Sequence, residues 1–365
     1  MPSLKMPAHF AGSHWSKRMH SIAIVGAGRV GQIRAGAIRR SKDSFLAAAV
    51  DIDRARAEKL AEGTEAIVST DWSSVIARPE VDTVVVSTPT KFHPDVAIAA
   101  LRAGKHVLCE KPLGRNVAEA REMFEAALQS RRVLKTGFNY RHMAHVRKAR
   151  ELLEANAIGP LHFLRSRYGH GGRPGYEKEW CTDAELSGGG VLLEQGIHIF
   201  DLVRFLLGEP VQLVVQTQRC FWDFPAVEDN GFCLIETEHG LLAQIHISWT
   251  QWVNVFELEL FGRDGYLRLE GRDSHYGPQR LTWGKRKHDH SRPEQEIFEY
   301  PPIDSSWDLE WHEFCSAIEE DREPLGSASD GLRAQQLVES AYESASRRSW
   351  VSVPVFELLA QKAIQ

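Results

Sequence analysis

The sequence predicts two folded parts in series, an α/β part built around a parallel sheet and an α+β part built around a mainly antiparallel sheet. In the first part, short apolar runs alternate with helix-length segments, as in βαβ units joined by right-handed crossovers. In the second part, strand-like segments follow one another with turn signals between them. The 365 residues are enough for two or three domains at roughly 150 residues each.

Composition narrows the class of protein before any motif is considered. Hydrophobic residues make up 43% and charged residues 25% of the chain, as in average globular proteins. The net charge of −5 is the opposite of the basic excess that nucleic-acid binding favours. No apolar run is long enough to cross a bilayer, and the five cysteines include no C-x-x-C pair. We therefore expect a cytoplasmic protein with no nucleic-acid or membrane partner and no cysteine zinc site.

The parallel sheet is expected within residues 21–140. Residues 1–20 lack periodicity and the apolar core of a signal peptide, so we expect them to be a mobile extension. Strands are predicted from apolar and β-branched runs at residues 22–25, 45–51, 66–68, 83–87 and 106–109. Helices are predicted between them at residues 30–40, from Arg54 onward, and from His93 to Gly104. In the last of these segments, a proline suits the first helical turn and Gly104 suits the end of the helix.

The antiparallel sheet is expected within residues 141–365. Its predicted strands follow one another at residues 161–168, 212–219, 231–236, 241–250, 256–261 and 266–270. One helical block at residues 192–207 interrupts them, and helical periodicity returns at residues 307–320 and 331–347. Successive strands with few helices between them are typical of an α+β domain.

A glycine-rich turn follows the first predicted strand. Gly26, Gly28 and Gly31 fit the pattern G-x-G-x-x-G, with Arg29 and Val30 between the last two glycines. At a turn from strand to helix, the first glycine permits the tight turn and the second lets a pyrophosphate approach the backbone, while the third lets helix and strand pack closely. We therefore expect these five residues to hold the phosphates of a dinucleotide at the helix amino terminus.

Asp51 indicates which dinucleotide binds. It ends the second predicted strand, 20 residues after Gly31. A carboxylate at that spacing bonds the adenosine ribose hydroxyls and repels a 2′-phosphate, so we expect NAD rather than NADP. Arg54 and Arg56 would soften that preference. Asp53 is interpreted as the N-cap of the next helix.

Further polar residues follow the fourth and fifth strands. Ligands of doubly wound sheets bind beyond the carboxyl ends of the strands, where these residues lie. We therefore assign to the cofactor site Ser87, Thr88, Pro89, His93, Glu110 and Lys111. Lys111, in the tripeptide Glu110-Lys111-Pro112, is expected near the nicotinamide.

The segment from Gly188 to Asp201 carries an acid–base pair. On a helix, Glu194 and His198 stand four residues apart and share a face. A histidine suits removal of a hydroxyl proton, and the Lys111 ammonium suits stabilisation of the negative charge that develops on oxygen. Lys111 and His198 can titrate as a coupled pair, which leaves open which of them takes the proton. Glu194 and His198 lack a third ligand at a suitable spacing, so we expect no metal.

These motifs make the sequence resemble the glucose–fructose oxidoreductase and inositol dehydrogenase (Gfo/Idh/MocA) family. The resemblance rests on the glycine motif and on AGKHVLCEKP (103–112), GGGVLLEQGIHIFD (188–201) and SASDGLRAQQLVESAYESA (327–345). It implies a Rossmann domain joined to an open-faced sheet domain that also mediates assembly into a homodimer or homotetramer. It further implies hydride transfer between NAD and a hydroxyl or ketone of a sugar, cyclitol, sugar acid or nucleotide sugar, with Lys111 and His198 as the catalytic pair. The family commonly has Asp where this chain has Glu194.

Candidate substrate ligands are sought near this pair. The glycine-rich loop at residues 168–180 supplies aromatic rings that can stack on sugars, and Arg173 suits an acidic group on the substrate. The segment Asn139-Tyr140-Arg141 stands at the domain junction, where the resemblance implies that it faces the substrate. We therefore expect the substrate to contact Lys111, Asn139, Arg141, Tyr168, Arg173, Tyr176, Glu194 and His198.

Two other functions remain open at this stage. Some relatives in such a family are glycosidases that keep NAD bound and oxidise the sugar transiently. Others bind a dinucleotide as sensors without catalysing a reaction. Retention of both Lys111 and His198 argues against the sensor.

Overall fold

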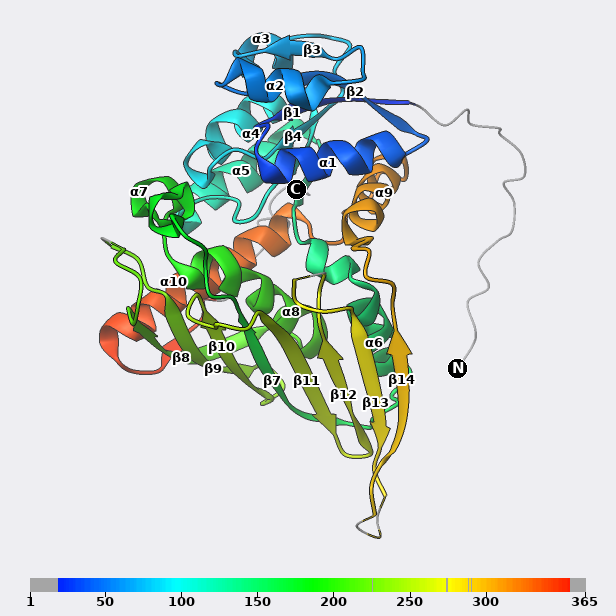
Figure 1. Ribbon diagram of the computed structural model, residues 1–365, viewed down its shortest axis with the longest axis vertical. Coiled ribbons are helices and arrows are strands. Elements are labelled where there is room, and N and C mark those ends of the chain that lie inside the picture. Colours follow the sequence, from blue (N-terminus) through cyan, green and yellow to red (C-terminus); the bar gives the residue numbers. More distant parts are fainter. Residues whose placement is uncertain (1–18, 225, 274, 288, 290, 355–365) are drawn as a thin grey trace, which may run out of the picture.

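The computed structural model describes residues 19–224, 226–273, 275–287, 289 and 291–354 of the chain (Figure 1). The extension expected at residues 1–20 lies outside this range except for Met19 and His20. Within the described residues, no helix combines the length and apolarity needed to cross a membrane.

The first part is a six-stranded parallel sheet in the order β3-β2-β1-β4-β5-β6. This confirms the predicted α/β class, and the strands lie close to their predicted positions. The sequence patterns did not indicate β6. The strands are β1 His20–Val25, β2 Ser44–Val50, β3 Ile67–Ser69, β4 Thr83–Val86, β5 His106–Cys109 and β6 Leu134–Thr136.

Helices cover both faces of this sheet. Asp53 accepts a hydrogen bond from the main chain of Ala55, which confirms it as the N-cap of α2, and Asn116 caps α5 through Glu119. The helices are α1 Arg29–Arg40, α2 Arg54–Ala61, α3 Trp72–Ile76, α4 His93–Arg102 and α5 Val117–Ser130, with a short 3₁₀ turn at Thr90–Phe92. The core beside α1 is completed from far along the chain by Trp311 and Phe314 of α9 (Ser306–Glu319).

The second part is a nine-stranded sheet in the order β14-β13-β12-β11-β7-β10-β9-β8-β15. Of its pairs, only β7 and β10 run parallel within the described chain, so the predicted mainly antiparallel sheet is confirmed. The sequence patterns did not indicate β13 and β14. The strands are β7 Leu161–Gly169, β8 Pro210–Gln218, β9 Asn230–Thr237, β10 Leu242–Ser248, β11 Val255–Gly262, β12 Gly265–Glu270, β13 Arg280–Lys285, β14 Glu294–Glu299 and β15 Val351–Ser352.

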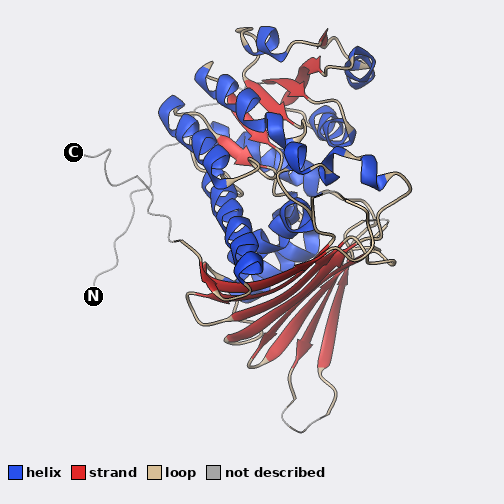
Figure 2. Ribbon diagram, turned by 90° about the vertical axis from the view of Figure 1, so that its left-hand side faces the viewer, coloured by secondary structure: helices blue, strands red, loops and turns tan. Residues whose placement is uncertain are grey.

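Helices cover one face of this larger sheet and leave the other bare (Figure 2). The covering helices are α6 Ala144–Glu154, α8 Ile197–Leu207 and α10 Ala328–Arg347. Helix α10 also packs on α5 and β6, so it joins the two parts of the molecule. It begins with a capping box in which Ser327 and Asp330 bond each other's main chain. Further short helical elements are found at residues 139–142, 176–178, 180–182, 184–187 and 192–196.

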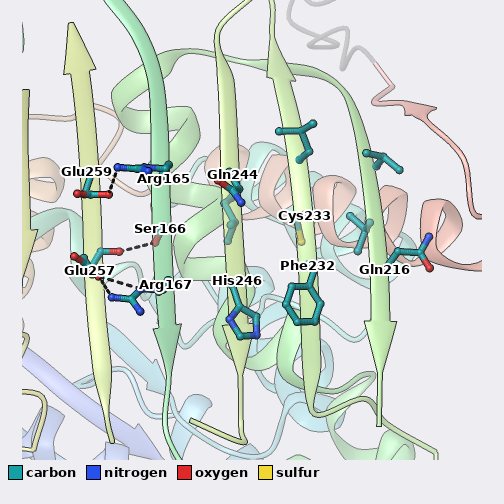
Figure 3. A pocket seen from close by; sticks show the side chains of 14 residues that line it. Arg165, Ser166, Arg167, Gln216, Phe232, Cys233, Gln244, His246, Glu257 and Glu259 are labelled. Carbon is teal, nitrogen blue, oxygen red and sulfur yellow. Dashed lines mark hydrogen bonds and ion pairs between the residues drawn. The ribbon is translucent and has the colours of Figure 1, made fainter. Parts of the chain in front are cut away.

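The bare face mixes apolar and charged side chains (Figure 3). Phe232 of β9 stacks on His246 of β10, with ring centroids 4.2 Å apart. Arg165 of β7 forms an ion pair with Glu259 of β11 at 3.0 Å, and Arg167 pairs with Glu257. The face therefore carries matched charges around exposed hydrophobic groups.

A buried charge network holds α9 against the first sheet. The fully buried guanidinium of Arg34 on α1 lies 2.6 Å from a carboxylate oxygen of Glu110 and 2.6 Å from one of Glu310 on α9. Lys135 on β6, also fully buried, lies 3.5 Å from Glu310. Burial alone raises the pKa of Glu310, but Arg34 and Lys135 bring it below its ordinary value. The carboxylate of Glu310 thus compensates two buried cations.

The substitution Glu310→Ala should therefore lower the free energy of unfolding by about 3–5 kcal/mol, because it leaves buried positive charge unpaired. The matched control is Asp308→Ala on the same helix, whose exposed partner Arg40 lies 2.6 Å away. The control should cost less than about 1 kcal/mol. Urea denaturation measures both, and equal small losses would show that the network contributes little.

Candidate active site

The glycine motif forms a tight cradle with one open position. Gly26 has a φ of +101°, and a side chain there would lie 2.6 Å from the main chain of Ser87. A Cβ on Gly31 would lie 2.0 Å from the carbonyl oxygen of Gly26. A Cβ on Gly28 would meet no atom within 4 Å. The space over Gly28 therefore fits a pyrophosphate at the amino terminus of α1, as the sequence indicates.

Asp51 lies immediately after β2, beside this cradle. Its carboxylate accepts hydrogen bonds from the main-chain N–H of Ala27, at 2.7 Å, and of Asp53, at 2.9 Å. Asp51 therefore shapes the glycine turn in addition to the ribose contact expected from its position. Arg29 and Val30, the other two predicted phosphate-site residues, form the first turn of α1.

The loops after β4 and β5 are tied to the cradle and to each other. The Ser87 hydroxyl donates to the carbonyl of Gly26 at 2.7 Å. The buried ring of His93 places Nδ1 2.8 Å from the carbonyl oxygen of Pro112 and Nε2 2.9 Å from that of Thr88. Burial lowers the pKa of His93. His93 therefore fixes the distance between the Thr88-Pro89 loop and the loop that carries Lys111.

Lys111 meets Glu194 where the helix before His198 is irregular. The segment 192–207 is helical, as predicted, but it is not one regular helix, because Leu192–Gly196 forms a π-helical turn before α8. The Lys111 ammonium donates to the main-chain carbonyl of Glu194 at 2.5 Å and to its carboxylate at 2.8 Å. Such wide turns are frequent at functional sites, and this one presents a carbonyl to the lysine.

His198 lies in the first turn of α8 and is 4% exposed. Its ring stacks on Tyr140 with centroids 3.9 Å apart and planes 7° from parallel. Burial, together with the positive charges of Lys111 and Arg272, holds the pKa of His198 well below its ordinary value. The imidazole is therefore neutral at pH 7 and able to accept a proton.

Arg272, which the sequence analysis did not single out, follows β12. Its guanidinium donates to the hydroxyls of Tyr140 and Tyr168, the latter at 3.2 Å, and to the carboxylate of Asp273 at 2.7 Å. A lone arginine in a loop gives no signal in the sequence. Only the pairing of β12 with β11, and of β11 with β7, brings it to the edge where Tyr168 ends its strand.

Comparison with known proteins agrees with this geometry. Residues 20–138 match the family profile described as "Oxidoreductase family, NAD-binding Rossmann fold" (GFO_IDH_MocA), and residues 146–268 match its C-terminal domain profile. The chain belongs to the Gfo/Idh/MocA oxidoreductase family. It is an oxidoreductase, and its first domain is the NAD-binding Rossmann domain of that family.

Individual family members span most of the chain. D-glucoside 3-dehydrogenase of Escherichia coli K12 is 32% identical over 247 residues, 62% of this chain and 70% of that protein. Inositol 2-dehydrogenase of Rhizobium meliloti 1021 is 27% identical over 336 residues, 90% of this chain and 98% of that protein. The structure of levoglucosan dehydrogenase in complex with NADH shares the fold, with a TM-score of 0.83 and 24% identity, covering 93% of this chain and all of that one.

Three residues that were predicted to contact the cofactor or the substrate bind other protein groups. Glu110 pairs with Arg34, and the Asn139 amide donates to the hydroxyl of Ser306 at 2.9 Å. Arg141 is buried between the carboxylates of Asp201 and Asp330, at 2.6 and 2.9 Å. The structure therefore brings Lys111, Glu194, His198 and Tyr168 together with Tyr140. As ligands of cofactor or substrate, Glu110, Asn139 and Arg141 remain predictions.

Two predicted substrate ligands in the loop after β7 have different surroundings. Tyr176 is 3% exposed and packs edge-on against Trp222 and Trp249. Arg173 is exposed and pairs with Glu179. The Arg173 side chain thus reaches solvent, whereas the Tyr176 ring packs inside the loop, and as substrate ligands both remain predictions. Among the described residues, no group of three or more His, Cys, Asp and Glu side chains could hold a metal ion.

The substitution Gly28→Ala should weaken NAD binding about tenfold, or about 1.4 kcal/mol, without changing the melting temperature. The backbone at Gly28, with φ −68° and ψ −168°, is open to alanine, so the added methyl group only fills the space over the turn. Gly31→Ala, which forces a contact with Gly26, should lower both affinity and stability. Cofactor affinity is measured by titrating the protein and following the fluorescence of the reduced cofactor, and stability is measured by thermal melts. An unchanged affinity in Gly28→Ala would contradict the prediction.

Proposed function

We propose that this chain is an NAD-dependent dehydrogenase that oxidises a secondary hydroxyl of a sugar or cyclitol, or reduces the matching ketone. The observation that carries the proposal is the neutral, buried imidazole of His198 close to the ammonium of Lys111, at the carboxyl edge of the NAD-binding sheet. A base and a hydrogen-bond donor for one oxygen atom are what alcohol oxidation needs.

Each of the chain's groups has a distinct task in this reaction. His198 accepts the hydroxyl proton at Nε2, because Nδ1 is buried without a hydrogen-bond partner. Lys111 donates a hydrogen bond to the substrate oxygen as negative charge develops there. Glu194 holds the Lys111 ammonium through its carbonyl and carboxylate. Bound NAD supplies the hydride acceptor for the carbon. In the reverse direction, the same groups return the proton to a carbonyl oxygen.

The proposed substrate class is a polyhydroxylated ring. Relatives that span much of the chain are named for inositol and for a D-glucoside, and a related fold belongs to levoglucosan dehydrogenase. All three names denote ring compounds with several hydroxyl groups. Exposed Arg173 extends the proposal to a ring that carries a carboxylate or phosphate.

Turnover should appear as NADH absorbance when the protein is given a panel of cyclitols, monosaccharides, glycosides, anhydrosugars, sugar acids and nucleotide sugars. Lys111→Ala and His198→Ala should each lower kcat by about 10²- to 10⁴-fold, because each removes a group that acts on the proton or the oxygen. NAD affinity should stay nearly intact, because the glycine cradle that holds the pyrophosphate is unchanged in both variants, although Lys111 is expected near the nicotinamide.

Surface variants provide the matched controls. Lys148→Ala changes a half-buried residue of α6 and His239→Ala an exposed residue of the β9–β10 turn, and both should keep full turnover. Release of an aglycone without net NADH would replace the proposal with a glycosidase. NAD binding without turnover of any compound would replace it with a sensor.

We further propose that the bare face of the nine-stranded sheet binds the same face of a second copy. Sheet faces are normally covered by another layer, and this face carries exposed Phe232 beside paired charges such as Arg165 and Glu259. A face that holds both signs of charge can meet itself across a twofold axis.

The substitution Phe232→Glu should therefore convert a dimer or tetramer into smaller species at micromolar concentration, because it buries a charge at the interface. Ile303→Glu, at an exposed apolar residue away from this face, is the control and should leave the assembly intact. Sedimentation velocity reports the result. A monomeric unmodified protein would rule out the proposed interface.

A further inference from the structure

The imidazole of His198 lacks the usual device that orients a histidine base. Such a base is ordinarily held by a hydrogen bond from its second ring nitrogen to a carboxylate or carbonyl. Here Nδ1 of His198 is buried and has no hydrogen-bond partner in the described structure. Glu194, which lies four residues before His198, instead accepts a hydrogen bond from Lys111 through its carboxylate. Another contact must therefore hold the ring.

Aromatic contacts surround the ring instead. Tyr140 stacks on one face of His198, with 3.9 Å between centroids and 7° between planes. Phe138, from the same segment after β6, meets the imidazole edge-on at 6.2 Å and 69°. Side chains in closely packed interiors are restricted to few orientations. The position of the Tyr140 ring therefore sets the plane of the imidazole.

Tyr140 is itself held at its far end. Its hydroxyl contacts the Tyr168 hydroxyl and accepts a hydrogen bond from Arg272. Arg272 is fixed in turn by the Asp273 carboxylate at 2.7 Å and by the Tyr276 ring, whose centroid lies 4.3 Å from the guanidinium carbon. The Arg272 side chain is 19% exposed, and its Nε atom is buried without a partner. Burial alone would lower the pKa of Arg272, but the neighbouring tyrosines and Asp273 raise it above its ordinary value, so the guanidinium stays charged.

We propose that Tyr140 and Arg272 are positioning residues for His198: the stacked phenol orients the imidazole toward the substrate, and the anchored guanidinium places a fixed positive charge near it. The proposal rests on the proposed function of His198 as the base and adds what controls that base. Neither residue needs to touch the reacting atoms, because each acts through the imidazole.

The charges around His198 determine whether its pKa rises or falls when the charge of Arg272 is lost. Lys111 and Arg272 are positive and disfavour the imidazolium, while Glu194 is engaged by Lys111. Tyr140 and Tyr168 stay neutral, since burial raises the pKa of Tyr140 to about 12 and that of Tyr168 well above 10. Because its pKa is lowered, the His198 imidazole is uncharged near pH 7. It becomes protonated, and inactive as a base, only as the pH falls through that lowered pKa. Loss of the Arg272 charge must raise this pKa.

The first test is the titration of His198, followed by NMR of ¹³C-histidine-labelled full-length protein with NAD bound, and assigned with His198→Gln. In the unmodified protein, His198 should stay neutral where an ordinary histidine, with a pKa of about 6.5, is already charged. Arg272→Met should raise the proton affinity of His198 about tenfold, whereas Arg272→Lys, which keeps the charge, should raise it less. Arg280→Met, an arginine on β13 paired with Glu270, is the control and should change nothing.

The second test uses kinetics, on a compound of the panel that is oxidised, to separate the role of the stacked Tyr140 ring from that of Arg272, which anchors it. Tyr140→Leu should lower kcat about tenfold or more with little change in KM, because the base loses its orientation. Tyr140→Phe keeps the stacked ring and should restore most of kcat. In Arg272→Met, the acid limb of the kcat/KM profile should move to higher pH together with the NMR titration.

An unchanged titration in Arg272→Met, or an unchanged kcat in Tyr140→Leu, would overturn the inference. Failure of the proposed function gives a different pattern. In that case His198→Ala keeps its turnover, or no compound is oxidised, and the NMR titration still reports whether Arg272 acts on His198.

Discussion

The buried guanidinium of Arg34 is the contact on which the arrangement of the site depends. It lies on the helix that begins at the glycine motif, and it binds Glu110, the residue before Lys111. Its other branch binds Glu310 on α9, more than 270 residues further along the chain. One side chain thus couples the cofactor cradle, the strand end that carries the lysine, and a helix from the end of the sequence. A buried charge of this kind is costly unless every partner is in place, which favours a single arrangement of the three.

A second charge network does the same around His198. Arg141 binds Asp201 on α8 and Asp330 on α10, and Arg204 on α8 approaches the same Asp330 at 3.2 Å. Helix α8 presents His198, and the segment of Arg141 presents Tyr140. The imidazole of His198 and the Tyr140 ring stacked on it are therefore fixed relative to each other by ion pairs about one helical turn away. This accounts for the use of Arg141 within the protein at a position where the family resemblance suggested a substrate contact.

The sequence predicted the elements that form because of interactions between residues close together in the chain. Apolar runs marked β1, β4 and β5, and Asp53 was recognised as a cap, because burial on both sheet faces and N-capping leave their signature in adjacent residues. The sequence did not indicate strand β14, because the side chains of this strand are mostly exposed. It did not indicate the π-helical turn at Leu192–Gly196 either, because no sequence period distinguishes a π-helical turn from a regular helix.

The sequence by itself determined the chemistry available to this protein: a glycine turn for a dinucleotide, Asp51 beside it, and Lys111, Glu194 and His198 in motifs specific enough to indicate the family. Those features rest on short-range spacing, which the chain carries directly. Only the tertiary structure decided how the groups are paired. Glu194 binds Lys111, and Nδ1 of His198 has no hydrogen-bond partner among the described residues. Tyr140 stacks on the imidazole, and Arg272, from another segment, donates a hydrogen bond to the Tyr140 hydroxyl. Such pairings follow from strand order and helix packing, which bring together residues that no local spacing relates.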